Sequence, residues 1–586
     1  MKRSTTLSLL LGLLALLSFL SLTGARPHRH FDEEELGIVL GPHEFPDDDN
    51  TEDDDLGDII GPHEVEVKRS DFPDDFIFGT SVSAYQVEGA KKGAGRGMTT
   101  WDQFTHMYAD KVQNNSDGDM GVDFINRYKE DIQLMKELRT NGFRFSISWT
   151  RVLPYGRVSN GVNEKGVQFY NDLINELLDN GIQPAITLFH WESPLALETE
   201  YNGFLSKDIV KDFRDFARFC FQRFGDRVKN WATFNEPSVY SVAGYSKGKK
   251  APGRCSPWEN DLCMTGDSSR EAYITAHNQI LAHVAAVDEF RKCDKCEGGK
   301  IGIVLVSHWY EPKDPNSEDD KKSARRSLDF QLGWFLDPLT RGEYPEVMKE
   351  DVGERLPKFT PEESKVLKEK CYLDFVGLNY YGAFFVTAND KVNISKLSYA
   401  ADLATNFTTE QKESPHLKAS SMGIVVYPLG LRRVLKHIKD YYNDPEIYIM
   451  ENGLDEMDDG QKSLEEALND KGRKEFLNSH ILMMGKAIRF DEVRVKGYFV
   501  WSLMDNFEWD RGYRVRFGLY YVDYNDDMKR HMRSSGEWLR KFLDTDMTIS
   551  VCYFESHRAK GYAPKLFDRE FTEYVTEPMT YASDFI

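Results

Sequence analysis

Residues 228–237 read Val-Lys-Asn-Trp-Ala-Thr-Phe-Asn-Glu-Pro, and residues 447–453 read Ile-Tyr-Ile-Met-Glu-Asn-Gly. In each stretch an apolar run typical of a buried strand ends in a glutamate beside an asparagine, Glu236 in the first and Glu451 in the second. Two such carboxyl groups are what glycosidic hydrolysis by double displacement requires, because one attacks the anomeric carbon and the other donates a proton to the leaving oxygen. This chemistry requires no cofactor and no metal, and we predict neither.

Other apolar runs rich in β-formers alternate with longer amphipathic stretches. The runs are 143–149, 183–189, 228–234, 300–306, 375–379, 447–450 and 495–501, and the amphipathic stretches include 126–139 and 164–180. This alternation predicts a single (β/α)8 TIM barrel with loop insertions, in which functional groups lie where the strands end. The residues that end or follow such runs are His190, Glu236, Asn379, Glu451 and Trp501. A doubly wound sheet is the alternative fold, although no glycine-rich phosphate loop is present.

The chain resembles glycoside hydrolase family 1, the family of the β-glucosidases and myrosinases, over about 470 residues from Phe72 to near Asp544. The motifs TFNEP at 233–237 and ENG at 451–453 carry the resemblance. Other blocks follow in the order of the family: FPDDFIFGT at 72–80, AYQVEG at 84–89, FRFSISW at 143–149, TLFHW at 187–191, GLNYY at 377–381, WSLMDNFEW at 501–509 and RFGLY at 516–520. The resemblance implies the barrel fold and β-glucosidase activity.

The resemblance also implies a role for each matching residue. Glu236 is the expected acid/base and Glu451 the expected nucleophile. Arg144 and Tyr381 are expected beside the nucleophile, where a cation and a phenol favour an ionised carboxylate, whereas burial and the charge of Glu451 should keep Glu236 protonated. The implied substrate-binding residues offer amides, a carboxylate, an imidazole and rings that suit a sugar: Gln86, His190, Asn235, Asn379, Trp501, Glu508, Trp509 and Phe517.

Two departures from the myrosinase pattern favour oxygen-linked substrates. Glu236 stands where myrosinases carry glutamine, and Ala243 stands where they place an arginine for the substrate's sulfate. We therefore expect a retaining β-glucosidase that hydrolyses terminal β-D-glucosyl residues from small-molecule O-glucosides of specialised or defence metabolism. Met422 to Ile424 replace a tryptophan that stacks on the aglycone in many plant members, so aglycone contacts should differ. A myrosinase-like thioglucosidase, a transglucosidase and a catalytically silent sugar-binding protein are the alternatives.

Composition limits the classes of partner. The net charge is −22 and no basic block contains interleaved aromatic residues, which argues against nucleic acid and anionic membrane surfaces. A chain of 586 residues with 40% hydrophobic residues suits one large decorated barrel. The expected partner is a small-molecule β-glucoside, and a homo-oligomer is left open.

The N-terminus has the pattern of a targeting segment. Residues 1–25 combine a basic start, a leucine-rich run and small residues, as in a cleaved signal peptide; a signal anchor is the alternative. Residues 26–70 are acidic and carry a duplication, LGIVLGPHE at 36–44 and LGDIIGPHE at 56–64. Blocks of like charge predict a disordered linker or propeptide there, with a sorting signal or interaction tail as alternatives.

The barrel is predicted to span 71–545, with a C-terminal extension at 546–586. The signal peptide predicts entry into the secretory pathway, with the vacuole, the extracellular space or a compartment derived from the endoplasmic reticulum as destination.

Seven cysteines and three sequons fit an oxidising compartment. The resemblance to plant members of the family implies a disulfide between Cys255 and Cys263. Cys293 and Cys296 form a lone CxxC, which we interpret as a surface disulfide or as two free thiols, because one pair is too little for zinc. N-glycosylation is predicted at the sequons of Asn114, Asn393 and Asn406. No metal site is predicted.

Overall fold

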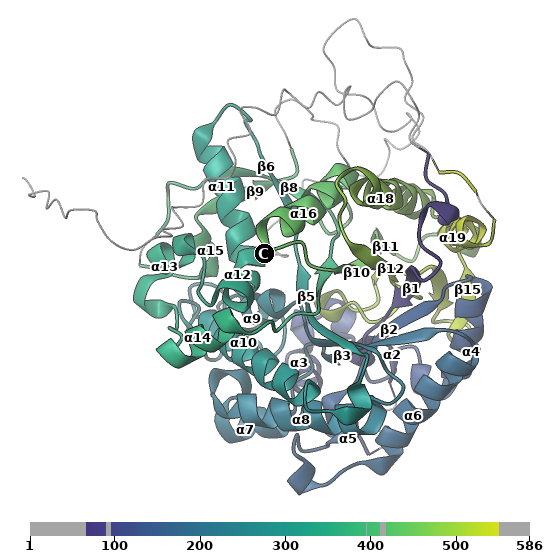
Figure 1. Ribbon diagram of the computed structural model, residues 1–586, viewed down its shortest axis with the longest axis horizontal. Helices are drawn as coiled ribbons and strands as arrows, with labels where there is room; N and C mark the ends of the chain where they lie inside the picture. Colours follow the sequence, from purple (N-terminus) through teal and green to yellow (C-terminus); the bar gives the residue numbers. More distant parts are fainter. Residues whose placement is uncertain (1–65, 90–94, 394, 411–417, 546, 550–586) are drawn as a thin grey trace, which may run out of the picture. The chain divides into compact units, whose positions relative to one another are not determined.

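The computed structural model describes residues 66–89, 95–393, 395–410, 418–545 and 547–549. Within them eight parallel strands close into a barrel in the order β1-β12-β10-β7-β5-β4-β3-β2 (Figure 1). The strands are β1 (Ile77–Ser81), β2 (Gly142–Ser146), β3 (Gln183–Phe189), β4 (Asn230–Asn235), β5 (Lys300–Val306), β7 (Phe375–Asn379), β10 (Ile447–Asn452) and β12 (Val495–Trp501). The predicted (β/α)8 barrel is therefore confirmed. The predicted signal peptide, almost all of the acidic segment and most of the C-terminal extension lie outside the described residues.

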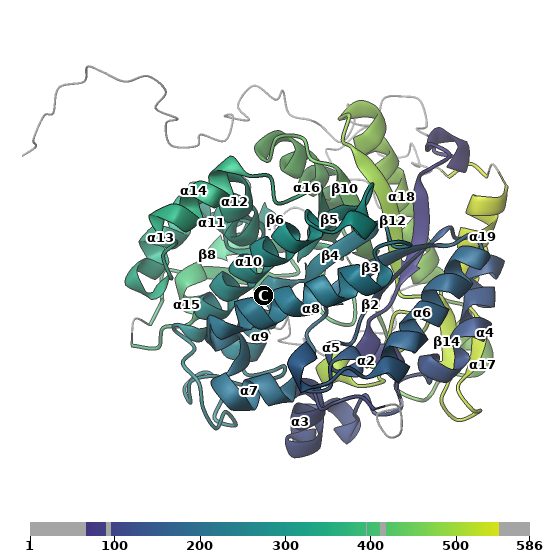
Figure 2. The same ribbon diagram turned by 60° about the horizontal axis from the view of Figure 1, so that its bottom comes forward.

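Helices surround the strands (Figure 1), and several bury an apolar stripe. In α6, for example, Tyr170, Leu173, Ile174 and Leu177 recur at helical spacing and are all buried. Neighbouring helices α8 and α10 lie side by side (Figure 2). The surrounding helices are α4 (Phe124–Glu137), α6 (Glu164–Asp179), α8 (Asp208–Phe224), α10 (Glu271–Phe290), α12 (Trp334–Arg341), α16 (Pro428–Tyr441), α18 (Lys471–Phe490) and α19 (Ser534–Asp544).

Side chains fill the interior of the barrel. One buried cluster draws its members from seven of the eight strands: Ile77, Ala185, Ala232, Val304, Phe375, Tyr448, Met450 and Phe499. Glycine is required at Gly79, because a Cβ there would lie 2.5 Å from the Phe499 ring. The strands are buried on both faces, so they appear in the sequence as continuous apolar runs rather than as alternating ones.

The predicted strand bounds are correct for β3, β5, β7 and β12 and shifted elsewhere. The run 143–149 was too long at its end, because Trp149 begins the short helix α5 (Trp149–Val152). The run 228–234 began too early, since the Val228 amide still bonds to Phe224 at the end of α8. The predicted helices 126–139 and 164–180 correspond to α4 and α6; α4 begins two residues earlier, and Arg139 beyond its end has a positive φ of 64°.

Insertions decorate the barrel. A small sheet of β6 (Trp309–Pro312), β8 (Ala383–Ala388) and β9 (Thr405–Thr408) follows the ends of β5 and β7. Two antiparallel pairs join β11 (Glu456–Met457) to β13 (Val515–Arg516) and β14 (Tyr520–Asp523) to β15 (Lys529–Met532). Further helices are α2 (Ala84–Val87), α3 (Thr100–Met107), α7 (Leu195–Tyr201), α9 (Pro237–Tyr245), α11 (Glu318–Leu328), α13 (Glu346–Val352), α14 (Pro361–Glu369), α15 (Tyr399–Leu403) and α17 (Leu464–Leu468). Among the described helices, none combines the length and apolar character needed to cross a bilayer.

Candidate active site

Local irregularities at the ends of β4 and β10 aim the two glutamates. Glu236 follows β4 with a left-handed φ of 43°, and Pro237 then starts α9 with its φ already suited to a helix. A positive φ is costly for a glutamate and marks a position held by its surroundings. In β10 the pairing with both neighbouring strands slips between Ile449 and Asn452, which is the bulge that carries Glu451.

Hydrogen-bond donors surround the Glu451 carboxylate. Arg144, from β2, donates from Nη1 to Oε1 of Glu451, and the Tyr381 hydroxyl donates to Oε2 at 2.6 Å. Arg144 also donates from Nη2 to Oδ1 of Asn235 at 2.6 Å. Both the guanidinium and the carboxylate are buried, with side-chain exposures of 1% and 5%. A fixed cation and a phenol therefore hold this carboxylate in one orientation.

Glu236 has the opposite electrostatic setting. Its Oε1 accepts a hydrogen bond of 2.7 Å from Nδ2 of Asn379, and no cation bonds to it directly within the described residues. Burial first, and the negative charge of Glu451 second, raise the pKa of Glu236 to about 8. Asn379 also donates to Asn235 at 3.1 Å, so the two glutamates are linked through Asn235 and Arg144. One carboxyl group is paired with a cation, whereas the pKa of the other is raised, which is the division of settings that nucleophile and acid/base require.

Most of the sequence-predicted residues line one cavity. Nine of them contribute to its wall: His190, Asn235, Glu236, Tyr381, Glu451, Trp501, Glu508, Trp509 and Phe517. The other three do not line the cavity but donate hydrogen bonds to residues that do: Gln86, Arg144 and Asn379. Gln86 donates from Nε2 to Asn506 Oδ1 at 3.0 Å and to Glu508 Oε2 at 3.4 Å, so the structure places it as a support for Glu508.

Aromatic rings and polar groups meet in one part of the cavity. The His190 ring stacks between Trp501 and Trp509, with centroids 6.1 and 5.9 Å away, and its Nε2 lies 3.1 Å from Nδ2 of Asn235. Burial, followed by the charge of Arg144, lowers the pKa of His190 well below its usual range, so this imidazole is neutral. Burial likewise raises the pKa of Glu508 to about 8. These groups can share hydroxyl hydrogen bonds and cover an apolar sugar face.

Sequence reasoning missed six residues of the wall: Trp191, Val239, Lys250, Val306, Asp510 and Arg511. Met422 and Ile424 also line it, at the position where the resemblance implies different aglycone contacts. Trp191 and Asp510 directly follow predicted site residues and Arg511 comes two positions after Trp509, so adjacency was a usable signal for them. Lys250 comes from the loop after α9, and no local pattern distinguishes it. Trp191 has a φ of 71° and donates from its indole to the Asn235 carbonyl at 3.0 Å.

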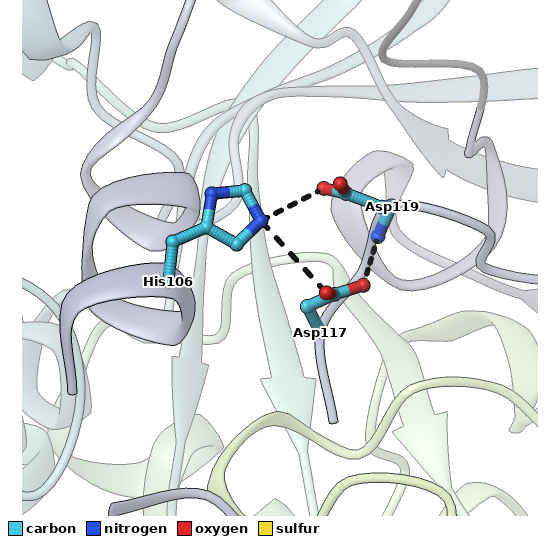
Figure 3. Close-up of side chains that lie close together, drawn as sticks. All are labelled: His106, Asp117 and Asp119. Carbon is cyan, nitrogen blue, oxygen red and sulfur yellow. Dashed lines mark hydrogen bonds and ion pairs between the residues drawn. The ribbon is translucent and has the colours of Figure 1, made fainter. Parts of the chain in front are cut away.

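Two other polar features lie outside this cavity. His106 Nε2 lies 3.2 Å from Asp119 Oδ1 and 3.8 Å from Asp117 Oδ2 (Figure 3). This group is partly exposed, and contacts between a histidine and carboxylates of this kind are common without a metal, so we assign no metal there. A groove of about 310 Å³ lies beside α8. Both of its carboxyl groups are ion-paired, Asp212 with Arg157 at 2.9 Å and Asp215 with Arg218 at 2.9 Å, so they do not form the pair that the chemistry above requires.

The cysteines are now assigned in the described residues. Cys255 and Cys263 form the disulfide that the resemblance implies, with an S–S distance of 2.05 Å. Cys293 and Cys296 are also paired, which selects the disulfide from the two readings of that motif. The asparagines of the three sequons, Asn114, Asn393 and Asn406, are all exposed, and their glycosylation stays a prediction.

Comparisons with known proteins point to one family. The sequence model of Glycosyl hydrolase family 1 matches residues 68–547. Beta-glucosidase 33 of Arabidopsis thaliana is 66% identical over 614 residues, covering 100% of each chain. A rice β-glucosidase mutant in a covalent complex with Glc has a TM-score of 0.79 at 42% identity, covering 82% of this chain and 100% of that one. A β-glucosidase from the fungus Humicola insolens in complex with glucose has a TM-score of 0.77 at 37% identity, covering 81% and 98%.

Proposed function

The chain belongs to glycosyl hydrolase family 1 and is a β-glucosidase, and we propose that it hydrolyses small-molecule O-glucosides with retention of configuration. The observation that carries the proposal is the opposite setting of its two carboxyl groups in one cavity. Glu451 accepts bonds from Arg144 and Tyr381, whereas burial raises the pKa of Glu236 to about 8. This is the arrangement that double displacement requires.

In the first step Glu451 attacks the anomeric carbon and forms a glycosyl ester. The bond from that carbon to the aglycone oxygen breaks, and this oxygen takes the proton of Glu236. Glu236 is then ionised and removes a proton from a water molecule. This proton restores the acid form of Glu236, while the water oxygen bonds to the anomeric carbon, the ester bond breaks and Glu451 leaves as a carboxylate. Two inversions at one carbon leave the product with the starting configuration. The covalent complex reported for the rice relative supports this route.

The aglycone end of the cavity supports a small, partly apolar leaving group. Val239, Val306, Met422 and Ile424 line it, and no tryptophan stands at Met422, so the wall is aliphatic. An apolar wall of this kind also suits an alcohol that accepts the glucosyl group in place of water. Transglucosylation is therefore the second candidate, and glucosides formed in the presence of added alcohols would reveal it.

We further propose that the protein works in the secretory pathway, in the vacuole or outside the cell. The signal-like residues 1–25 support this, and so do the two disulfides, because disulfides persist in oxidising compartments. A fluorescent fusion placed after residue 25, with and without the leader, would test the prediction by its location in plant cells.

The proposed reaction is tested by trapping its intermediate. The purified protein is incubated with a 2-deoxy-2-fluoro-β-glucoside that has a good leaving group, and its intact mass is measured beside a Glu451→Gln variant. A fluoroglucosyl adduct on the wild type that is absent from the variant supports both the sugar and the nucleophile. A folded wild type without an adduct would contradict the proposal and favour a protein that binds sugar without turnover.

A further inference from the structure

A threonine that no step of the proposed reaction uses lies behind the cation of the nucleophile. Nε of Arg144 donates a hydrogen bond of 3.1 Å to the Thr187 hydroxyl. The other two nitrogens of the guanidinium have different acceptors: Nη1 donates to Glu451, and Nη2 donates to Asn235 at 2.6 Å. Each of the three nitrogens of this planar group therefore has an acceptor, and three acceptors fix both its position and its tilt.

The fold places Thr187 at the boundary between the apolar interior of the barrel and its polar end. Thr187 lies in β3, two residues after Ala185, which belongs to the apolar cluster of the interior. Side chains two residues apart point to the same face of a strand, so Thr187 also faces the interior, one layer nearer to the strand ends. Thr187 and Arg144 are exposed by 0% and 1%, so their hydrogen bond is shielded from bulk water.

Burial makes this hydrogen bond important for the orientation of the guanidinium. A buried N–H group that loses its acceptor has a desolvation cost, and the cost is greater for a charged group. Without the Thr187 hydroxyl, Nε of Arg144 would have to turn toward another acceptor. The guanidinium is planar and rigid, so its other two nitrogens would turn with it and would pull on the groups that they bind.

Both carboxyl groups of the proposed reaction are connected to this guanidinium. Glu451 accepts a hydrogen bond from it directly. Glu236 is connected through two amides. Asn235 Oδ1 accepts from Arg144 Nη2 and, at 3.1 Å, from Asn379 Nδ2. Asn379 Nδ2 also donates to Glu236 Oε1 at 2.7 Å. A turn of the guanidinium would therefore displace the two carboxyl groups relative to each other.

We infer that Thr187 is a positioning residue, which holds Arg144 from behind and thereby fixes how the nucleophile and the acid/base lie relative to each other. This inference rests on the proposed double displacement and adds to it a residue that does not line the cavity. Attack on the anomeric carbon needs a near-attack geometry, and a small displacement of a reacting group slows the chemical step strongly. Thr187 should consequently affect the rate of the first step rather than the affinity for the sugar.

The test replaces the Thr187 hydroxyl with a methyl group of nearly the same size. Thr187→Val is incubated with a 2-deoxy-2-fluoro-β-glucoside at several concentrations, which gives the rate constant of glycosyl-enzyme formation and the apparent affinity separately. Thr187→Ser is the conservative variant, because serine keeps the acceptor. The matched control is Thr80→Val, the same replacement at a fully buried threonine of β1 whose hydroxyl bonds to none of the described site residues.

We expect the rate constant to fall about tenfold in Thr187→Val, as for loss of one hydrogen bond to a charged group, while the apparent affinity and the inhibition by free glucose stay at their wild-type values. Thr187→Ser and Thr80→Val should react at the wild-type rate. A wild-type rate constant in Thr187→Val would overturn the inference. If Thr187→Val does not fold, Thr187→Ser and Thr187→Ala give the same comparison, because only serine keeps the acceptor.

A double-mutant cycle shows whether the effect passes through Arg144. Lysine has no N–H group at the position of Nε, so in Arg144→Lys the Thr187 hydroxyl has lost its donor and Thr187→Val should cause no further decrease. An equal decrease in both backgrounds would show that Thr187 acts by another route and would overturn the inference. A folded wild type without an adduct would instead contradict the proposed reaction, so the two failures are distinguishable.

Discussion

The hydroxyl of Tyr381 donates a hydrogen bond of 2.6 Å to Oε2 of Glu451. Tyr381 follows β7 and Glu451 lies in β10, its neighbour in the barrel, so the contact joins two adjacent strand ends. Burial and the charge of Glu451 raise the pKa of Tyr381 well above its usual range, so the phenol remains a donor at every pH at which the protein is active. The nucleophile is thereby oriented before any substrate arrives.

Tyr381→Phe should therefore slow formation of the glycosyl-enzyme. Removing one preorganised donor from a reacting group costs about 10²-fold in rate. The inactivation rate by a 2-fluoroglucoside measures this step directly. Tyr155→Phe is the control, because Tyr155 is 59% exposed and lies outside the cavity. Equal inactivation rates in both variants would show that the contact does not serve catalysis.

Glu236→Gln should lose the acid/base but keep the nucleophile. Hydrolysis of a glucoside with a poor leaving group should fall about 10²–10⁴-fold, because general acid catalysis contributes that much. Azide needs no base, so it should attack the glycosyl-enzyme in this variant and release β-glucosyl azide. An exposed control is Glu259→Gln. If azide restores no turnover and yields no glucosyl azide, Glu236 is not the acid/base.

The activity should fall on the alkaline side near pH 8. Burial and the charge of Glu451 raise the pKa of Glu236 to about 8, and the first step requires its protonated form, so kcat/KM decreases as the pH rises through that value. Glu508 titrates in the same range, which makes a comparison of variants necessary. The alkaline decrease in kcat/KM should vanish in Glu236→Gln and persist in Glu508→Gln. The reverse pattern would assign this decrease to Glu508.

Much of this arrangement could be predicted from the sequence because it follows the strands. β3, β5, β7 and β12 are apolar runs with correct predicted bounds. β1 was not predicted as a strand, since it is short and contains Gly79 and Ser81. β10 extends two residues beyond its apolar run, because two polar residues continue the strand: Glu451 lines the cavity, and Asn452 is buried and bonded to Tyr380 and Tyr498. A strand bound predicted from apolar residues is therefore too early where the strand ends in polar or charged residues of the site.

The ion pair of Lys250 and Asp510 on the cavity wall could not be predicted from the sequence. Lys250 and Asp510 are 260 positions apart and meet only after the barrel has closed. Lys250 lies in the loop after α9, and Asp510 lies in the short helical turn Trp509–Arg511. Neither stands in an apolar run, so nothing local indicates that they share a cavity. The same holds for Val239 and Val306, which look like ordinary core residues in the sequence.

Stability should fall as the pH rises, in part because of Glu508. Burial raises its pKa from 4.5 to about 8, so between these values the folded state retains a proton that the unfolded state releases. The folded state binds more protons, and stability therefore declines with increasing pH. Glu508→Gln removes this penalty. Its Tm should exceed that of wild type by about 2 °C or more near pH 9, and the difference should shrink near pH 5. Glu465→Gln, at an exposed site, should show no such trend.

The Cys255–Cys263 disulfide should matter for the aglycone more than for glucose. Its loop contains the chain that follows Lys250, and Gly248 packs so closely on it that a Cβ would lie 2.1 Å from Cys263 Sγ. Cys255→Ser with Cys263→Ser should lower the free energy of unfolding by about 2–3 kcal/mol, as expected for a short closed loop. Because Gly248 packs on this disulfide and Lys250, two residues later, lines the cavity, KM for aryl glucosides should rise while inhibition by free glucose changes little. The matched control is Cys293→Ser with Cys296→Ser, whose disulfide packs against Gly225 after α8 and does not line the cavity. Identical changes in KM for both pairs would show that the effect is general destabilisation.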